Sequence, residues 1–374
     1  MFSLRDLWKR HRRKVFVSFG VVGSSYLLYK LYGAHKYRIK ELERELASDR
    51  ENDVLIKAQL QEHFASIQRI ADTTTLPHAV DSLHNRIAKE LDLSPLTDRL
   101  VQGKGQPNSL TPLEKLELWE RLQILSFTRT VVSVWALTMT SLYIRVQVNI
   151  LGRHLYIDIA RGLGSSLVHD DRDADGRQCQ QQYLETSDFL SNSGLPSLIK
   201  DMQAAASEIL KGKQLRDCFS NSLLHETILQ ILDMFMSSGK PHHWLNYLMP
   251  GSAGSNGSSL SLSYDHNIGP EISKFDQLMA ETRAVLSSSE FENVIEMSLV
   301  TLVSALMEDM GFQPTEGSPS PSPGMPLAKL LPKIVLMGPL LLQEGTRDRY
   351  IEVVQKIPEV ELFFTLLYAN TPVV

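Results

Sequence analysis

Apolar positions along the chain fall into helical patterns almost throughout, and the longest pattern covers residues 113–151. This stretch contains no proline or glycine between Pro112 and Gly152, so it can form one uninterrupted helix. Thr111 is a good N-cap residue, Pro112 suits the first turn, and Gly152 is a natural stop at the other end. We therefore predict a helix over residues 112–151.

The two halves of this helix differ in character. The first half is amphipathic, with charged residues opposite a stripe of leucines (Leu118, Leu122 and Leu125). In the second half, only fifteen residues separate Arg129 from Arg145, whereas a bilayer needs about 20 apolar residues. We therefore interpret the second half as buried on all sides in a helical bundle, with the first half reaching the surface.

Shorter helical patterns fill most of the remaining chain, while strand-like alternation and internal repeats are nearly absent. Helices are predicted near residues 78–92, 180–190, 195–211, 215–237, 275–287 and 291–310, and later pieces are broken at Pro332, Pro339 and Pro358. Other features are a break at Leu76-Pro77, an extended segment at 153–159, and flexible loops near 161–178, 250–270 and 313–326. The predicted fold is all-α: an N-terminal membrane-anchor helix followed by a single large helical bundle around a long central helix (about 112–151).

The first 40 residues carry a charge of opposite sign to the rest of the chain. They hold ten lysines and arginines against one acid, which leaves 28 bases and 42 acids for the other residues. An acidic body argues against nucleic-acid binding, and a basic head is typical of a segment that meets a membrane. Val15–Tyr32 follows the basic run, and as a helix it would span about 27 Å, close to the ~30 Å of a hydrocarbon core.

We therefore interpret residues 1–33 as a basic targeting segment with a transmembrane anchor, residues 34–72 as a charged connecting helix, and residues 73–374 as an all-helical body. Two alternatives for the apolar segment stay open. A secretory signal peptide has the same basic and apolar regions, but no A-x-A-like cleavage site is evident. A buried core helix is the other alternative. Flanking charges nearly balance, so they do not decide the orientation in the membrane.

Motifs that could carry chemistry are weak in this sequence. The two cysteines are too few for a disulfide framework or a zinc site, which indicates a reducing compartment. Asp171–Gly176 matches the opening of an EF-hand loop, but Gln182 stands where that loop needs a bidentate glutamate. His242-His243 lacks partners at metal-ligand spacing. We predict no catalytic residues, no cofactor, no metal and no small-molecule substrate.

Trp119 is the more informative residue. It lies at the margin of the leucine stripe, one helical turn from Lys115 and Gln123. One interpretation is that it closes the edge of the core. The other is that it anchors a partner helix, because tryptophan is enriched in binding hot spots.

Several segments carry a resemblance to a known family. They are LWKRHRRKVFVSFGVVGSSYLLYKLYG near the N-terminus, LELWERLQILSFTRTVVSVWALTMTSLYIRVQVNILG in the central helix, QQQYL at 180–184 and PLAKLLP at 326–332. In this order they resemble the peroxisomal biogenesis factor three (peroxin-three) family. The likeness is thin between residues 250 and 325, where the Gly/Ser and Ser/Pro loops depart from the family, so no function is assigned to those loops.

The resemblance implies a peroxisomal membrane protein whose body faces the cytosol and docks peroxin-nineteen, the import receptor for peroxisomal membrane proteins. An amphipathic helix of the receptor would lie in a hydrophobic groove of the body. The groove tryptophan of the family matches Trp119, its neighbours match Lys115 and Leu122, and the facing segment matches Thr97 and Leu100. The targeting signal of the family matches the anchor and the basic residues before it (Lys9, Arg10, Arg12, Arg13 and Lys14).

The resemblance thus implies a docking factor without enzymatic activity that binds the receptor, contacts peroxisomal membrane lipid and supports the insertion of peroxisomal membrane proteins. Two alternatives belong to other classes. A membrane-tethered helical enzyme acting on lipids would need a pocket with convergent histidines and carboxylates. A structural tether for other organelle partners would use the same helical body.

Overall fold

The computed structural model describes residue 58 and residues 61–105, 111–160, 170–251, 273–311 and 324–369. Residues Ser66–Val374 form one compact unit, which is the part considered below. The predicted anchor and targeting residues lie outside the described residues. So do most of the charged connecting helix and of the predicted loops at 250–270 and 313–326.

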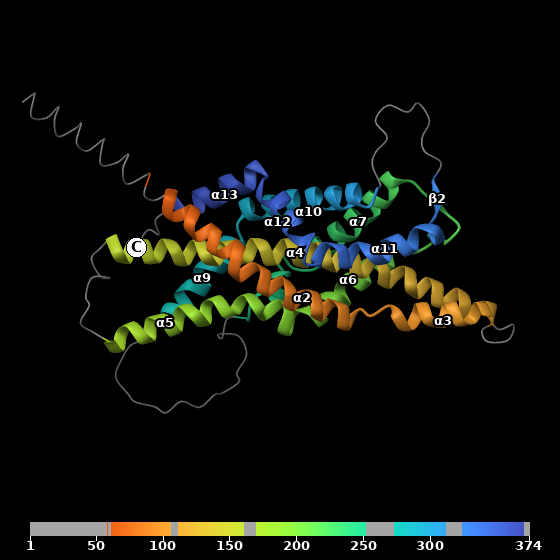
Figure 1. Ribbon diagram of the computed structural model, residues 1–374, viewed down its shortest axis with the longest axis horizontal. Coiled ribbons are helices and arrows are strands. Elements are labelled where there is room, and N and C mark those ends of the chain that lie inside the picture. The colour runs from red at the N-terminus through yellow and green to blue at the C-terminus, as the bar shows by residue number, and fades with distance from the viewer. Residues whose placement is uncertain are drawn as a thin grey trace, which may run out of the picture. The chain divides into compact units, whose positions relative to one another are not determined.

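The central helix, α4 (Pro112–Ala160), organises this unit (Figure 1). Its 49 residues span about 70 Å at 1.5 Å per residue. Every residue from Thr130 to Gln147 is buried, because other helices pack around this stretch. By length and composition α4 could cross a membrane, but its most apolar stretch is fully buried inside the protein. The prediction of a central helix buried in a bundle is confirmed.

The ends of α4 show one correct and one wrong prediction. Thr111 and Glu114 form a capping box in which the Thr111 N–H donates to the Glu114 carboxylate at 2.7 Å and the Glu114 N–H donates to the Thr111 hydroxyl at 3.2 Å. The predicted stop at Gly152 is wrong, because α4 continues through it and includes residues 153–159, which were expected to be extended. Gly152 instead allows close packing, since a Cβ there would overlap the side chain of Ile67.

Residues 61–70 are helical, and eleven further α-helices are described; together with short π and 3₁₀ turns they confirm the all-α fold. They are α2 (Leu76–Glu90), α3 (Ser94–Gly105), α5 (Asp170–Glu185), α6 (Leu195–Leu210), α7 (Asn221–Met236), α8 (Leu245–Leu248), α9 (Lys274–Leu286), α10 (Ser289–Asp309), α11 (Leu327–Leu342), α12 (Arg347–Gln355) and α13 (Pro358–Ala369). The short turns are η1 (Ala71–Thr75), η3 (Thr186–Asp188) and η4 (Leu190–Gly194). Among these elements, α11 makes the most extensive contact with α4.

Prolines interrupt the helices less than the sequence predicts. Pro77 lies in the first turn of α2, directly after the π-helical turn η1, so the chain stays helical through the expected break at Leu76-Pro77. Pro332 and Pro339 lie inside α11 rather than breaking it. The buried leucine-rich face of α11 outweighs the two backbone hydrogen bonds that these prolines remove. Pro358 does separate α12 from α13, as predicted.

Two segments have a different secondary structure from the one expected. Part of the predicted loop near 161–178 is helical, because α5 begins at Asp170 and packs against α4 and α9. The EF-hand-like run Asp171–Gly176 therefore lies in a helix. Residues 215–220, expected to be helical, contain the strand β1 (Cys218–Phe219), which pairs antiparallel with β2 (Met325–Pro326). Helix α7 begins only after Ser220, whose hydroxyl caps it.

Gly194 marks a point where two backbones meet. A Cβ at this position would overlap the backbone carbonyl of Tyr247. We expect Gly194→Ala to lower the free energy of unfolding by about 1–3 kcal/mol, because the backbone of one element must move. The measurement is the melting temperature of the full chain. Gly251→Ala is the matched control, since a Cβ there meets nothing within 4 Å; equal melting temperatures for the two variants would contradict the prediction.

Candidate docking surface

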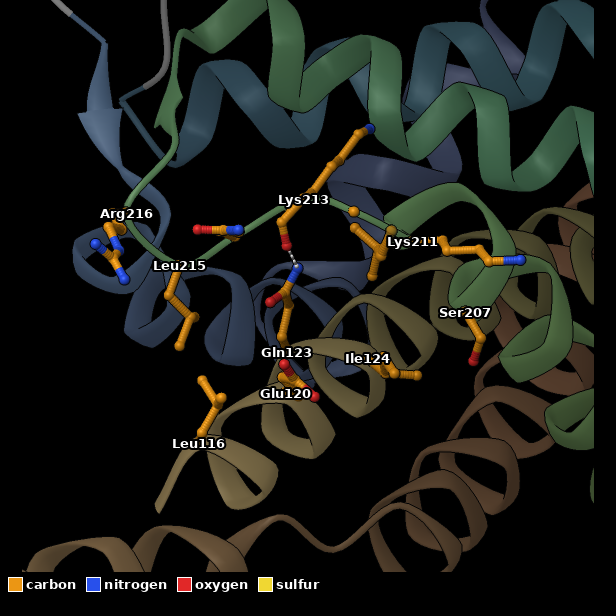
Figure 2. A pocket seen from close by; sticks show the side chains of 12 residues that line it. Leu116, Glu120, Gln123, Ile124, Ser207, Lys211, Lys213, Leu215 and Arg216 are labelled. Atoms are coloured by element: carbon orange, nitrogen blue, oxygen red, sulfur yellow. Dashed lines mark hydrogen bonds between the residues drawn. The ribbon is translucent and has the colours of Figure 1, made fainter. Parts of the chain in front are cut away.

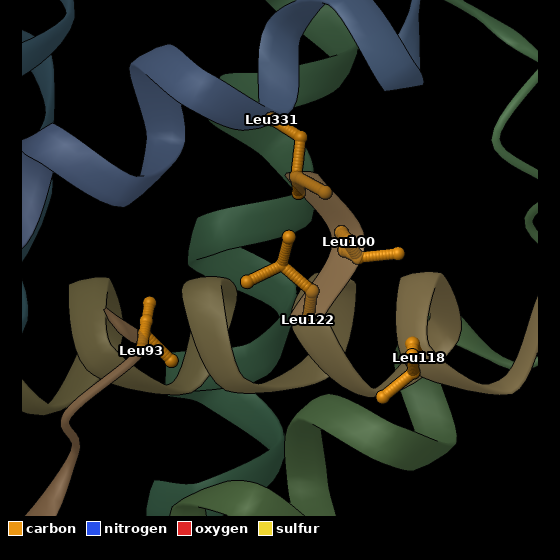
Figure 3. Close-up of a cluster of buried hydrophobic side chains, with 5 residues drawn as sticks. All are labelled: Leu93, Leu100, Leu118, Leu122 and Leu331. Atoms are coloured by element: carbon orange, nitrogen blue, oxygen red, sulfur yellow. The ribbon is translucent and has the colours of Figure 1, made fainter. Parts of the chain in front are cut away.

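A cluster of buried leucines lies where α3 and the first turns of α4 meet α11 (Figure 3). Its members are Leu93, Leu100, Leu118, Leu122 and Leu331. Partly buried hydrophobic residues pack against it, namely Leu96, Trp119, Leu125, Leu215 and Val335. The leucine stripe of the amphipathic half of α4 is therefore covered by α3 on one side and by α11 on the other.

The five residues predicted to bind a partner lie around this cluster, and we call them the Trp119 surface. They are Thr97, Leu100, Lys115, Trp119 and Leu122. The structure brings Leu100 and Leu122 together in the cluster, where they are 7% and 4% exposed and so form its floor. Thr97 and Lys115 are partly exposed and lie one helical turn from Leu100 and Trp119, respectively.

Trp119 packs against the core and keeps part of its surface exposed. Its ring packs against the leucine cluster, which fixes its position, and yet the residue is only partly buried. Gln123, one helical turn after Trp119, is 3% exposed and donates from Nε2 to the carbonyl of Lys213 at 3.4 Å. A tryptophan that is partly covered by its own protein loses little conformational entropy when a partner covers the rest of it.

Local hydrogen bonds fix the start of α3 beneath this surface. The Asp92 carboxylate accepts from the Ser94 N–H at 3.0 Å, and this interaction with Ser94 holds the pKa of Asp92 below its ordinary value. The Thr97 hydroxyl donates within its own helix, to the carbonyls of Ser94 at 2.9 Å and Leu93 at 3.2 Å. Its proton is thus already used, so Thr97 would offer a partner its methyl group or a hydroxyl lone pair.

The start of α4 is fixed in the same way. The hydrogen bonds that Glu114 accepts from the Thr111 N–H and hydroxyl hold the pKa of the Glu114 carboxyl below its ordinary value. The capping box therefore stays formed at neutral pH, and the first turn of α4 is ordered before any partner arrives.

Exposed apolar side chains occur on the elements that form or adjoin the Trp119 surface. Half of the large hydrophobic residues that are exposed in the described chain lie on α3, the first turns of α4, β2 or α11 (Val101, Leu113, Leu116, Met325 and Leu336). Leu113 and Leu116 were missed by the sequence reasoning because they lie off the leucine stripe, although their i, i+3 spacing gives them a common face of α4. Clustered exposed apolar residues are typical of interaction sites.

A cleft of about 460 Å³ opens on the neighbouring face of α4 (Figure 2). Leu116, Glu120, Gln123 and Ile124 form one wall, and residues 207–216 form the other. The cleft is therefore beside the Trp119 surface rather than around Trp119 itself, where the resemblance placed a groove.

The enzyme alternative calls for histidines and carboxylates that converge on a pocket. His154 lies 2.7 Å from Glu281, but that carboxylate also pairs with Arg153, and the three residues tie α4 to α9 away from the cleft. In the described part of the chain, no group of three or more His, Cys, Asp or Glu side chains could hold a metal ion. The histidine and carboxylate are accounted for by packing between helices.

Comparison with known proteins places the chain among peroxisome biogenesis factors. The family model described as Peroxin-3 matches residues 102–370. The chain is 51% identical over 372 residues to "Peroxisome biogenesis protein 3-2" of Arabidopsis thaliana, with 100% of both chains covered. It is 30% identical over 353 residues to "Peroxisomal biogenesis factor 3" of Homo sapiens, with 88% of this chain and 87% of the human protein covered.

Proposed function

The chain belongs to the Peroxin-3 family and is a peroxisome biogenesis factor, and from this premise we propose that it is a membrane-anchored docking protein for the import receptor peroxin-nineteen. In this proposal the receptor brings newly made peroxisomal membrane proteins, and the chain captures the loaded receptor at the membrane. The role supports insertion through binding alone and needs no catalytic step.

One observation carries the proposal more than any other. Trp119 packs against a buried leucine cluster yet remains partly exposed, and α3, α4 and α11, which form that cluster, also carry exposed apolar residues. Leu113 and Leu116, for example, are 65% and 50% exposed. An amphipathic helix whose apolar residues recur at i, i+3, i+4 and i+7 would cover this apolar area.

The Trp119 surface supplies different groups to such a helix. The ring of Trp119 would be the central anchor, and the floor of Leu100 and Leu122 would keep the ring in place. Lys115, one turn before Trp119, would meet acidic residues at the edge of the contact. Removal of apolar area from water would provide most of the affinity.

The membrane end of the proposal concerns residues 1–33. The basic residues Lys9, Arg10, Arg12, Arg13 and Lys14 would form the targeting signal, and the apolar segment after them would hold the chain in the peroxisomal membrane. With the body facing the cytosol, an anchored docking site would raise the local concentration of the receptor at the lipid surface.

Flotation with liposomes tests both ends of the proposal. The full chain is reconstituted into liposomes, purified receptor is added, and the fraction of receptor that floats is measured. We expect the receptor to float with the full chain. A chain lacking residues 1–33 should leave receptor in the soluble fraction, because its body would no longer be held on the liposome. Receptor that fails to float with the full chain would contradict the proposed capture.

A further inference from the structure

The cleft beside the Trp119 surface has two unlike walls. One is the exposed side of the first turns of α4, from Leu116 to Ile124. The other is the end of α6 with the segment that leads to β1, and Gly212, at φ +83°, turns the chain between them. Its volume of about 460 Å³ falls within the roughly 300–1,000 Å³ typical of ligand pockets.

The second wall is held in place before any ligand binds. The backbone N–H groups of Leu327 and Ala328 donate to the carbonyls of Asp217 and Leu215 at 3.0 and 2.9 Å, which fixes the segment to the start of α11. Gln123 of α4 donates to the Lys213 carbonyl across the bottom of the cleft (Figure 2). The cleft is therefore preformed, which lowers the entropic cost of filling it.

The chemistry of the lining combines apolar surface with excess positive charge. Leu116 and Leu215 point toward one another at the mouth (Figure 2). Lys211 and Arg216 are exposed on the second wall, and Glu120 is the one acidic residue among those that line the cleft. Such a lining suits an apolar group flanked by negative charge.

Lys213, the third cation among the lining residues, directs its ammonium group to residues outside the cleft. The Lys213 ammonium donates to the Thr227 hydroxyl at 3.1 Å and lies over the ring of Phe219, 5.8 Å from its centroid. Burial lowers the pKa of Lys213. It contributes its carbonyl to the cleft and its side chain to the packing around α7. Lys211 forms an exposed ion pair with Glu208 at 3.7 Å, so Arg216 is the main cation that a ligand would meet.

The cleft is continuous with the Trp119 surface. Leu215 lines the cleft and also packs against the leucine cluster that supports Trp119. Leu116 lines the cleft and precedes Trp119 by three residues, so both lie on adjoining sides of the same helical turn. The Trp119 surface and the cleft therefore adjoin each other along α4.

Resting on the proposed function, we infer that the cleft is a second subsite for the same receptor. Its occupant is the stretch of the receptor that continues beyond the helix on the Trp119 surface. An apolar side chain of that stretch sits between Leu116 and Leu215, and an adjacent carboxylate faces Arg216. The subsite adds affinity and directionality, because a receptor helix bound in the reverse orientation would place its continuation away from the cleft.

The test compares two ligands on the full chain in nanodiscs: a peptide limited to the N-terminal helix of the receptor, and the full-length receptor. We expect Arg216→Glu to weaken binding of the full-length receptor by about 10-fold and to leave the affinity of the short peptide unchanged. Lys240→Glu, a charge reversal at an exposed lysine that does not line the cleft, is the matched control and should change neither affinity. The effect of Arg216→Glu should shrink as salt is raised.

Every other outcome overturns the inference in an identifiable way. If Arg216→Glu changes neither affinity, the cleft is not a receptor subsite. Equal weakening of both ligands would mean that Arg216 acts on the helix at the Trp119 surface. A change in the number of chains per nanodisc would assign the cleft to a second copy of the chain. If the wild-type chain binds neither ligand, the proposed function is wrong, and the inference of a second receptor subsite is wrong as well.

Discussion

Trp119→Ala should weaken binding of the receptor by ~30- to 1000-fold, which corresponds to about 2–4 kcal/mol for truncation of a hot-spot tryptophan. The effect is large because the ring is held by the leucine cluster and already partly shielded, so a partner gains its remaining area at little entropic cost. The measurement is a titration of the full chain with the full-length receptor, with circular dichroism to confirm that the helices remain.

Two comparisons separate a binding anchor from a core residue. Leu362→Ala removes an apolar side chain that is 58% exposed on α13, far along the chain from the Trp119 surface, and should leave the affinity unchanged. Trp119→Phe keeps an aromatic ring and should lose less affinity than Trp119→Ala. Full binding by a folded Trp119→Ala variant would show that the docking site lies elsewhere.

Glu281→Gln should lower the free energy of unfolding by about 3 kcal/mol, because it removes the charge that balances a buried cation. The side chain of Arg153 is 6% exposed and ion-pairs with Glu281, and His154 lies 2.7 Å from the same carboxylate. Burial lowers the pKa of the Arg153 guanidinium, although an arginine keeps its charge at neutral pH. Glutamine has nearly the same shape as glutamate but carries no charge, so the effect of the substitution is electrostatic.

The matched control is Glu292→Gln at a more exposed ion pair. Glu292 lies 3.1 Å from His242 and its side chain is 50% exposed, so solvent screens the interaction and its removal should cost less than 1 kcal/mol. Melting temperatures of the full-length variants provide the comparison. If Glu281→Gln has the same melting temperature as wild type, the charge of the Arg153 guanidinium is balanced by other groups.

Local patterns were sufficient to predict the centre of the fold. The long uncharged stretch, the N-cap residue Thr111 and the leucine stripe are all properties of neighbouring residues, and they predicted α4 as the central helix. The start of α4 was correct because a cap depends on a few adjacent side chains. The position of Trp119 at the margin of the leucine stripe was predicted in the same way, because helical spacing defines that stripe.

Long-range contacts explain what the sequence did not predict. Gly152 looks like a helix stop, but its role depends on Ile67, a residue far away along the chain. Pro332 and Pro339 look like breaks, but burial against α4 keeps α11 helical. At the site, α3 and α4 supply the predicted residues, while the contribution of Leu331 and the cleft wall near Leu215 arise from packing between distant segments.

Buried polar residues in α4 show the same limit. Thr138 donates to the Val134 carbonyl within α4 itself, whereas Gln147 and Tyr143 have partners in other segments. Gln147 donates to the Tyr183 carbonyl at 2.7 Å and to the Thr186 hydroxyl at 2.8 Å, and Tyr143 lies 2.9 Å from Thr186. Burial raises the pKa of Tyr143 to about 12, so this network stays uncharged at physiological pH.

Hydrogen–deuterium exchange of the full chain, with and without the N-terminal helix peptide of the receptor, tests the central claim most directly. It reports where the peptide lies without any substitution. We predict that protection on binding concentrates in α3, in the first turns of α4 around Trp119 and at the start of α11. Protection confined to other surfaces, such as the outer face of α13, or no protection at a saturating peptide concentration, would contradict the assignment of the docking site.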